Sequence, residues 1–445
     1  MGLRVRRVPR HRGPAAWDAI LPPGPTYPAL HAQKTADVVV VGAGFAGLSA
    51  VRRVQQIDPT ARIVLLEAGR IGEGAAGRNS GFMIDLPHEL SSADYAGAGD
   101  DRALIALNRS AIGFGRDAVE DFGIDPNFFD PAGKVNGAAS SAAQRHNRSY
   151  AAHLARLGEP FEMLDRQQMQ ELTGSAHYRS GLYTAGTVML QPAGYVRGLA
   201  AGLHKRGTQV FEETPVTRMA RMGTDWEVRT PSGGVTAPRV ILAVNGHLES
   251  FGLAQNRLMQ IFLFATMTPE LSATAVAALG GAPRWGITPS DPMGTTVRRI
   301  DTGQGGNRIV TRTCAVMRSN MAATSGDLRR AAQVMQTKFD TRFPQLSGMK
   351  MAYAWAGHLC LSRNGVAIMQ EVEEGVFSAC VQNGLGTTRG TLTGMGAAER
   401  ALGVESEVTR HFTVQAAPHR LPPAPLRDVG ANAVLRFREW RAAAE

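Results

Sequence analysis

Three glycines early in the chain have the spacing of a phosphate-binding turn. Gly42, Gly44 and Gly47 form a GxGxxG pattern directly after the apolar run 38–41. Gly42 permits a tight turn, Gly44 lets the backbone approach a pyrophosphate, and Gly47 lets the following helix pack on the strand. Glu67 closes the next apolar run, at the spacing where a carboxylate meets a ribose. The pattern predicts a βαβ unit that binds a dinucleotide at a helix N-terminus.

The alternative interpretation is structural: the glycines would shape an ordinary turn and Glu67 would only end a strand. The context favours nucleotide binding. A helix expected from about Ala46 stops before Pro59, and "ARIVLLEAG" follows it as a second apolar strand. The glycines therefore lie between a strand and a helix, as the motif requires.

Composition indicates an ordinary globular protein of two or three domains' worth of core. The chain has 445 residues, of which 44% are hydrophobic and 19% charged. Its formal charge of +10 suits an anionic ligand, and the arginines are scattered without a basic stripe and interleaved aromatics. We therefore expect no nucleic-acid partner.

Three cysteines without CxxC spacing argue against disulfides or a metal site and favour a reducing, cytoplasmic compartment. The basic N-terminus lacks the apolar stretch of a secretory signal. No apolar run approaches the roughly 18 residues of a membrane span. From this we expect neither a metal nor a membrane partner.

The fold class expected is α/β with an α+β insert. A Rossmann-type nucleotide-binding domain is built from discontinuous segments, and a substrate domain carries a mixed or antiparallel sheet. A hairpin is expected around the glycines of "MGTTVRRIDTGQGGNRIVTRT". The expected divisions are an extended arm at 1–35; the nucleotide-binding domain at 36–97, 186–250 and 351–405; the substrate domain at 98–185 and 251–350; and a tail with a short helix at 406–445.

The order of these motifs resembles the D-amino-acid-oxidase superfamily of FAD-dependent oxidoreductases, and within it the γ-glutamylputrescine oxidase-like branch. The segment 75–81, "AAGRNSG", is similar to that branch's A-S-G-R-N-G-G. Further likeness lies in "GTVMLQPAGYVRGLAAGLHKRGTQVFEETPV", in "VILAVNG", and in "AWAGHLCLSRNG" followed by "NGLGTTRGTLTGMG". Together the segments span about residues 17 to 440.

The resemblance implies FAD as the cofactor. Arg78 to Gly81 would lie along the flavin, Val216 would meet the adenine, and a helix beginning at Thr387 would stabilise the reduced ring through its free N–H groups. Ser80 stands where the branch usually has glycine. The cofactor-binding residues expected are Gly42, Gly44, Phe45, Ala46, Gly47, Glu67, Ala68, Arg78, Asn79, Ser80, Gly81, Val216, Asn245, Gly357, Gly384, Leu385, Gly386, Thr387 and Thr388.

Catalytic candidates are few. His358 and Cys360 fall where the family approaches the flavin, and either could bond it covalently, although buried structural roles are commoner. His88 is expected to be a loop histidine. Ser80 would add a side chain near the ring. Arg298, one of two adjacent strand arginines that point to opposite faces, could pair with a substrate carboxylate.

The resemblance implies oxidation of the C–N bond of a primary or secondary amine or an amino acid, by hydride transfer to flavin N5. The resulting imine would hydrolyse to a carbonyl compound, and oxygen or another acceptor would reoxidise the flavin. Two alternatives stay open: another flavin reaction, such as hydroxy-acid dehydrogenation, and a non-catalytic flavin-binding protein with a structural or nucleic-acid-associated role. The sequence leaves the amine, the acceptor and the oligomeric state open.

Overall fold

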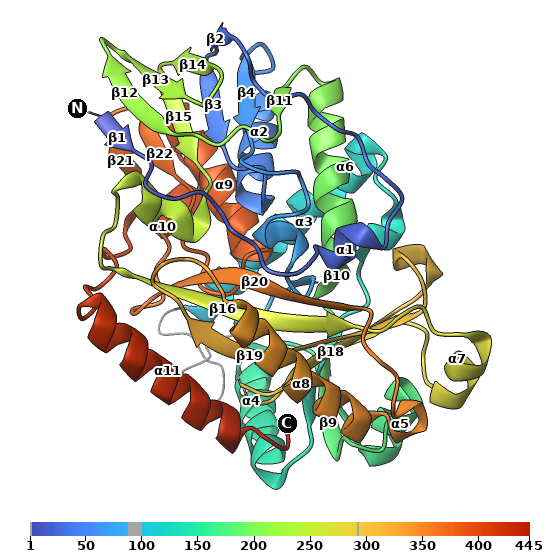
Figure 1. Cartoon of the computed structure of the whole chain (residues 1–445). Coiled ribbons are helices and arrows are strands. Elements are labelled where there is room, and N and C mark those ends of the chain that lie inside the picture. The colour runs from blue at the N-terminus through green and yellow to red at the C-terminus, as the bar shows by residue number, and fades with distance from the viewer. Residues whose placement is uncertain (1, 88–99, 292) are drawn as a thin grey trace.

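The computed structural model describes residues 2–87, 100–291 and 293–445, so His88 lies outside it. Two large sheets dominate the chain (Figure 1). A six-stranded sheet in the upper half has the order β11-β4-β3-β15-β22-β21 and is parallel except at β21. Its strands are β3 (Val38–Val41), β4 (Ile63–Leu66), β11 (Gln209–Phe211), β15 (Arg239–Leu242), β21 (Glu371–Glu373) and β22 (Val376–Ser378).

Parallel order forces crossover connections. A helix at 45–57 connects β3 to β4, whereas three strands at 218–237 connect β11 to β15. Every residue of β3 and β4 is buried, as their uninterrupted Val, Ile and Leu predict. Figure 1 shows helices packed beside this sheet. They are α2 (Phe45–Ile57), α3 (Asp101–Phe122), α6 (Pro192–Lys205), α9 (Thr388–Ala401) and α10 (Glu407–Thr413).

The second sheet has eight strands in the order β20-β16-β19-β18-β17-β7-β9-β8. All neighbours are antiparallel except β17 and β7. The expected hairpin is confirmed, because β18 and β19 pair across the glycine turn. The strands are β7 (Lys134–Ala138), β8 (Glu162–Leu164), β9 (Ser180–Thr184), β16 (Leu258–Met267), β17 (Trp285–Pro289), β18 (Thr296–Ile300), β19 (Arg308–Met317) and β20 (Tyr353–Ser362).

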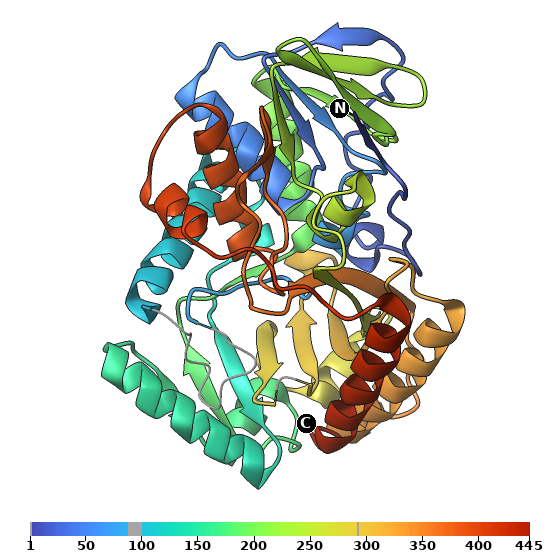
Figure 2. The same cartoon turned by 90° about the vertical axis from the view of Figure 1, so that its left-hand side faces the viewer.

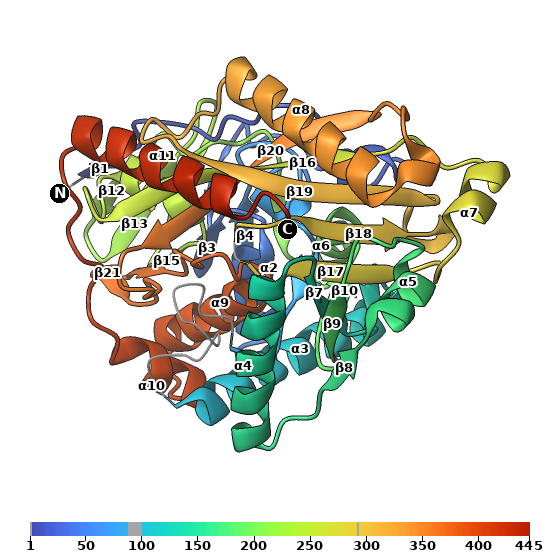
Figure 3. The ribbon, with the colours of Figure 1, turned by 90° about the horizontal axis from the view of Figure 1, so that it is seen from below.

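Helices cover this sheet from below and beside it (Figure 3). One face of β16 and β19 packs on α8 through Phe262, Phe264 and Met335. The opposite face packs on α11 through Ile261 and Leu435. The helices are α4 (Ser141–Leu157), α5 (Arg166–Thr173), α7 (Ala273–Leu279), α8 (Ser325–Arg342) and α11 (Ala424–Arg441).

Two small sheets complete the part of the chain that the structure describes. One has the order β1-β12-β13-β14-β2 and contains the N-terminal arm, and the other has the order β5-β10-β6. Within the described residues, no helix is both long and apolar enough to cross a membrane. Apart from short 3-10 turns, the α-helix and strands not yet named are β1 (Gly2–Arg4), α1 (Ala16–Ala19), β2 (Gln33–Thr35), β5 (Phe82–Met83), β6 (Phe129–Asp130), β10 (Val188–Leu190), β12 (Arg218–Met222), β13 (Asp225–Arg229) and β14 (Gly234–Ala237).

Candidate active site

The glycine turn joins β3 to α2 so tightly that two of its positions exclude side chains. Gly42 has φ +102°, and a Cβ there would lie 2.6 Å from the Ala243 carbonyl oxygen. A Cβ on Gly47 would lie 1.7 Å from the Gly42 carbonyl oxygen. At Gly44 the nearest atom, the Ala76 Cβ, is 3.6 Å away, so this position leaves room beside the backbone. The turn thus has the tight bend and the open approach that a pyrophosphate requires.

Glu67 follows β4 and its carboxylate lies beside the glycine turn. Oε2 accepts a hydrogen bond from the Ala43 N–H at 2.8 Å, and Oε1 accepts one from the Gly69 N–H at 3.1 Å. Burial raises the pKa of Glu67, while these backbone hydrogen bonds act to lower it. The residue lines the large cavity that begins at the turn.

The N-terminus of α9 faces the same cavity. The side chains of its first residues do not cap it: Thr387 Oγ1 donates to the Phe82 carbonyl oxygen at 2.7 Å, and Thr388 Oγ1 to that of Ile84 at 2.9 Å. The first N–H groups of a helix have no partner inside it. In α9 the Arg389 N–H already donates to the Leu385 carbonyl oxygen at 2.9 Å, so a ligand would use the other N–H groups of the first turn. Their partial positive charge suits an anion.

These parts line one cavity of about 470 Å³ between the two large sheets. All the expected cofactor residues border it except two. The two exceptions are Gly47, which packs α2 against the turn, and Thr388, whose hydroxyl donates to the Ile84 carbonyl oxygen. Elsewhere the cavity is lined by residues of β16, β18 and β19.

The expected flavin end is held together by backbone contacts. Arg78 Nε donates to the Glu73 carbonyl oxygen at 2.6 Å and Nη1 to that of Gly13 at 3.0 Å, which ties the N-terminal arm to this segment. Burial lowers the pKa of Arg78 to about 10. Asn79 Oδ1 accepts from the Gly81 N–H at 2.7 Å, and Ser80 borders the cavity.

His358 borders the cavity from β20 as a neutral imidazole. Gln260 Nε2 donates to the Glu249 carboxylate at 2.8 Å, so its Oε1 is the acceptor for His358 Nε2–H at 2.8 Å. Burial, with His247 and His11 nearby, lowers the pKa of His358 well below its usual range. Cys360 is fully buried in a separate core cluster and does not border the cavity.

Arg298 has a different place from the one expected. Its Nη1 donates to the Ser80 and Leu190 carbonyl oxygens at 3.0 and 2.6 Å, and its Nη2 donates to Gln304 Oε1 at 3.0 Å. It is fully buried and absent from the cavity wall. Its neighbour Arg299 is buried as well, because both faces of β18 are covered. Arg298 therefore holds the segment behind Ser80 and is not positioned to pair with a substrate carboxylate.

On the antiparallel sheet, the described arginine that borders the cavity is Arg312, on β19; Arg7, Arg10, Arg70 and Arg78 line the cavity elsewhere. Within the described residues, its buried Nε has no hydrogen-bond acceptor, and burial lowers the pKa of its guanidinium to about 10. Arg312 pairs with Thr296 on β18, so the two side chains share one face. Thr296 also borders the cavity, and its buried Oγ1 likewise has no partner among the described residues.

A β-bulge aims Arg312 into the cavity. Leu263 pairs with Ala315 but Phe264 pairs with Thr313, which leaves Cys314 unpaired with φ 62°. Beyond the bulge Arg312 pairs with Ala265. It therefore shares the cavity-facing side with Leu263 and Ala315. Strict alternation would have placed Arg312 on the face that packs on α8.

The comparisons with known proteins agree with this geometry. The family model "DAO: FAD dependent oxidoreductase" matches residues 37–400. The chain belongs to the DAO family of FAD-dependent oxidoreductases, and its cofactor is FAD. The residues present fit that cofactor, since the excluded Cβ positions at the turn, the buried Glu67 carboxylate and the uncapped α9 lie around one cavity.

Similar sequences extend over most of the chain. A "Probable oxidoreductase OrdL" of Rhizobium meliloti is 26% identical, with 88% of this chain and 89% of the relative covered. A "Gamma-glutamylputrescine oxidoreductase" of Escherichia coli is 23% identical, with 82% and 83% covered.

Among solved structures, glycine oxidase from Geobacillus kaustophilus has a TM-score of 0.68 at 16% identity, with 84% of this chain and 96% of that one covered. L-amino acid deaminase from Proteus vulgaris has a TM-score of 0.65 at 17% identity, with 87% of this chain and 94% of the deaminase chain covered. These two neighbours support the fold.

Proposed function

We propose that this protein uses FAD to oxidise the C–N bond of a primary or secondary amine that carries a carboxylate, giving an imine that hydrolyses to a carbonyl compound. The observation that carries the proposal is the Arg312–Thr296 pair, a guanidinium and a hydroxyl side chain on one face of the antiparallel sheet that both line the cavity. A guanidinium in a cavity wall suits a carboxylate, because its planar set of N–H donors matches the two carboxylate oxygens.

The similar proteins support the same class of substrate. One relative is named for γ-glutamylputrescine, and the structural neighbours are named for glycine and L-amino acids. An amine that carries a carboxylate is consistent with the compounds in these names, and its carboxylate could pair with the Arg312 guanidinium. A hydroxy acid would also satisfy Arg312, so the two substrate classes must be separated by experiment.

When bound, FAD supplies the acceptor for the two electrons and the hydrogen of the substrate C–H bond. The chain supplies orientation. Arg312 and Thr296 would hold the carboxylate end, so that the α-carbon is fixed at one place in the cavity. The α9 N-terminus offers partial positive charge to the negative charge that develops during the reaction.

Proton transfer places a condition on the substrate. Among the described residues that border the cavity, Glu67 is the one carboxylate, and it belongs to the glycine turn. His358 and His247 are neutral, because burial lowers the pKa of both imidazoles. We propose that the amine reacts in its neutral form, so that kcat/KM falls as pH drops below the pKa of the amine.

The test is Arg312→Met, assayed on amino acids and on the amines that lack their carboxylates. The variant should lower kcat/KM for the amino acids about tenfold to a hundredfold, since a hydrogen bond to a charged group contributes about 1.5–3 kcal/mol. It should leave the value for the matched amines nearly unchanged. Arg318→Met, one residue beyond the end of β19, removes a guanidinium that pairs with Asp327, away from the cavity, and serves as the control. An equal loss on both substrate sets would contradict the carboxylate assignment.

A further inference from the structure

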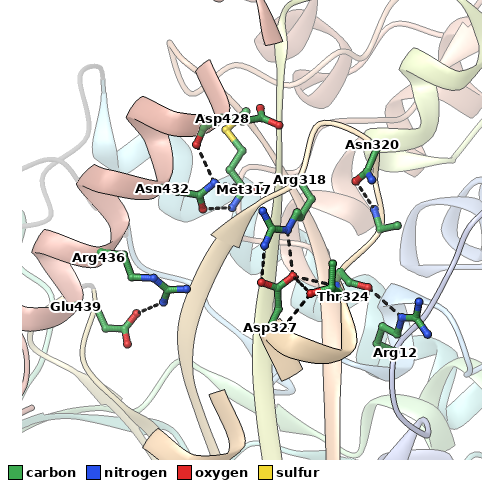
Figure 4. A network of polar contacts seen from close by, with 12 residues as sticks. Arg12, Met317, Arg318, Asn320, Thr324, Asp327, Asp428, Asn432, Arg436 and Glu439 are labelled. Atoms are coloured by element: carbon green, nitrogen blue, oxygen red, sulfur yellow. Dashed lines mark hydrogen bonds and ion pairs between the residues drawn. The ribbon is translucent and has the colours of Figure 1, made fainter. Parts of the chain in front are cut away.

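The C-terminal helix α11 faces the protein with much of its polar side. Asn432 Oδ1 accepts from the Met317 N–H at 2.9 Å (Figure 4), and Asp428 Oδ2 accepts from the Ser319 N–H at 3.3 Å. Nearer the C-terminus, Glu439 pairs with Arg330 of α8 at 2.6 Å. Between these polar contacts, Ala431 and Leu435 pack on the apolar side chains of the sheet. These contacts fix which side of α11 is turned outward.

The outward side of α11 is apolar. Leu426, Val429 and Trp440 are 72%, 74% and 72% exposed, and Val434 and Phe437 are 52% and 56% exposed. Their spacing of three to five residues keeps them on one side of the helix. Phe437 and Trp440 contact each other with ring centroids 6.0 Å apart. A contiguous exposed apolar stripe of this kind indicates an interaction surface.

The exposed charged side chains of α11 beside this stripe are positive. The carboxylates of α11 already have partners: Asp428 accepts a hydrogen bond from Ser319, and Glu439 forms ion pairs with Arg330 and Arg436. Arg438 and Arg441 are exposed at the aromatic end. An apolar stripe with aromatic residues and flanking arginines is typical of a helix that lies on a membrane surface.

A basic strip of the N-terminal arm continues the surface. Ser319 joins the two parts, because Arg7 donates to its carbonyl oxygen at 2.9 Å and Arg427 of α11 donates to its hydroxyl at 2.6 Å. Figure 2 shows the arm and α11 along the same side of the molecule. The arm contains no acidic residue between Gly2 and Gly13, and its exposed arginines are Arg4, Arg6, Arg7, Arg10 and Arg12.

We propose that this surface, the outward side of α11 with the arginines of the arm, docks the protein on an anionic lipid membrane. The apolar side chains would enter the interface while the arginines meet the headgroups. The absence of an apolar run long enough to span a bilayer is no obstacle, because the helix would lie in the plane of the interface. The helix also borders the cavity through Leu435, so docking would hold the cavity beside the membrane.

A second copy of the chain is a poorer occupant. A stable interface buries roughly 800 Å² on each partner, and the apolar strip has the width of a single helix. Pairing two such helices would also bring exposed arginines together without exposed carboxylates between them. Nucleic acid would meet the arginines and leave the apolar stripe unburied.

Trp440 provides the measurement, because the other four tryptophans are buried. The FAD-loaded protein is mixed with vesicles of equal parts phosphatidylglycerol and phosphatidylcholine, or of phosphatidylcholine alone. With the anionic vesicles, the emission should shift to the blue and the protein should float with the lipid. Leu426→Gln with Val429→Gln should weaken this partition about tenfold, and Arg6→Gln with Arg438→Gln should weaken it only on anionic vesicles.

The matched controls are Met222→Gln with Val414→Gln, which changes two exposed apolar side chains elsewhere, and Lys205→Gln. Both should bind as the unmodified protein does. Absence of flotation would overturn the proposal, as would equal binding by the Leu426/Val429 variant. A dimer in sedimentation that this variant abolishes would assign the surface to a second copy, and a Trp440 shift with duplex DNA but not with vesicles would assign it to nucleic acid.

Discussion

The carboxylate of Glu67 already accepts hydrogen bonds from the Ala43 and Gly69 N–H groups, and a cofactor ribose would add to them. Glu67→Gln exchanges one acceptor oxygen for a donor and removes the charge. We expect the FAD dissociation constant to rise about tenfold to a hundredfold, because charge-assisted hydrogen bonds contribute about 1.5–3 kcal/mol. Titration of the apoprotein with FAD measures this, with the exposed Glu405→Gln as control. An unchanged constant would mean that Glu67 does not reach the ribose.

The buried imidazole of His358 should make the free energy of unfolding depend on pH. Its imidazole has a pKa well below the usual value in the folded chain, so it takes up a proton in the unfolded chain first as pH falls below about 6.5. The stability that it contributes is therefore present above that pH and is lost as pH falls. His358→Asn should flatten the fall in unfolding free energy between pH 7 and 5, measured by urea unfolding. A fall as steep as in the unmodified protein would show that His358 does not titrate as described.

Among the elements, the crossing of α2 and α9 depends on one glycine. A Cβ on Gly394 would lie 2.1 Å from the Ala46 carbonyl oxygen, a backbone atom that cannot move alone. Gly394→Ala should cost about 3 kcal/mol of unfolding free energy and weaken FAD binding, because it pushes the α9 N-terminus from the cavity. Gly396→Ala is the control on the same helix, since the nearest atom there, at 3.0 Å, is the end of the Met369 side chain. Similar losses in both variants would indicate a general effect of alanine on α9.

Some elements follow from local pattern and others do not. The buried runs of β3 and β4, with glycines between them, predicted the βαβ unit, and glycines predicted the β18–β19 hairpin. The bulge at Cys314 has no signal in the sequence, because the one-residue shift in strand register arises only when β19 pairs with β16. It reverses which face Arg312 occupies. The sequence indicated only that Arg298 and its neighbour point to opposite faces of their strand, whereas the arginine of this sheet that lines the cavity is Arg312.

At the scale of the whole molecule, the cavity lies where residues far apart in the chain meet. The glycine turn, Glu67 and α9 come from three separate segments around the parallel sheet, and Arg312 comes from the antiparallel one. Motifs at the turn and at α9 made the FAD half predictable. The substrate half depends on strand pairing between segments without motifs. The outward stripe of α11 escaped prediction because a helix pattern shows an apolar side without showing whether it is buried.

The most direct test of the proposed function is anaerobic mixing of the FAD-loaded protein with amino acids, their decarboxylated amines and 2-hydroxy acids, followed by flavin absorbance. We expect bleaching of the oxidised flavin band by at least one carboxylate-bearing amine, faster as pH rises toward the pKa of that amine. The same substrate should release a carbonyl compound. Rapid bleaching by a hydroxy acid, with none by any amine or amino acid, would contradict the account.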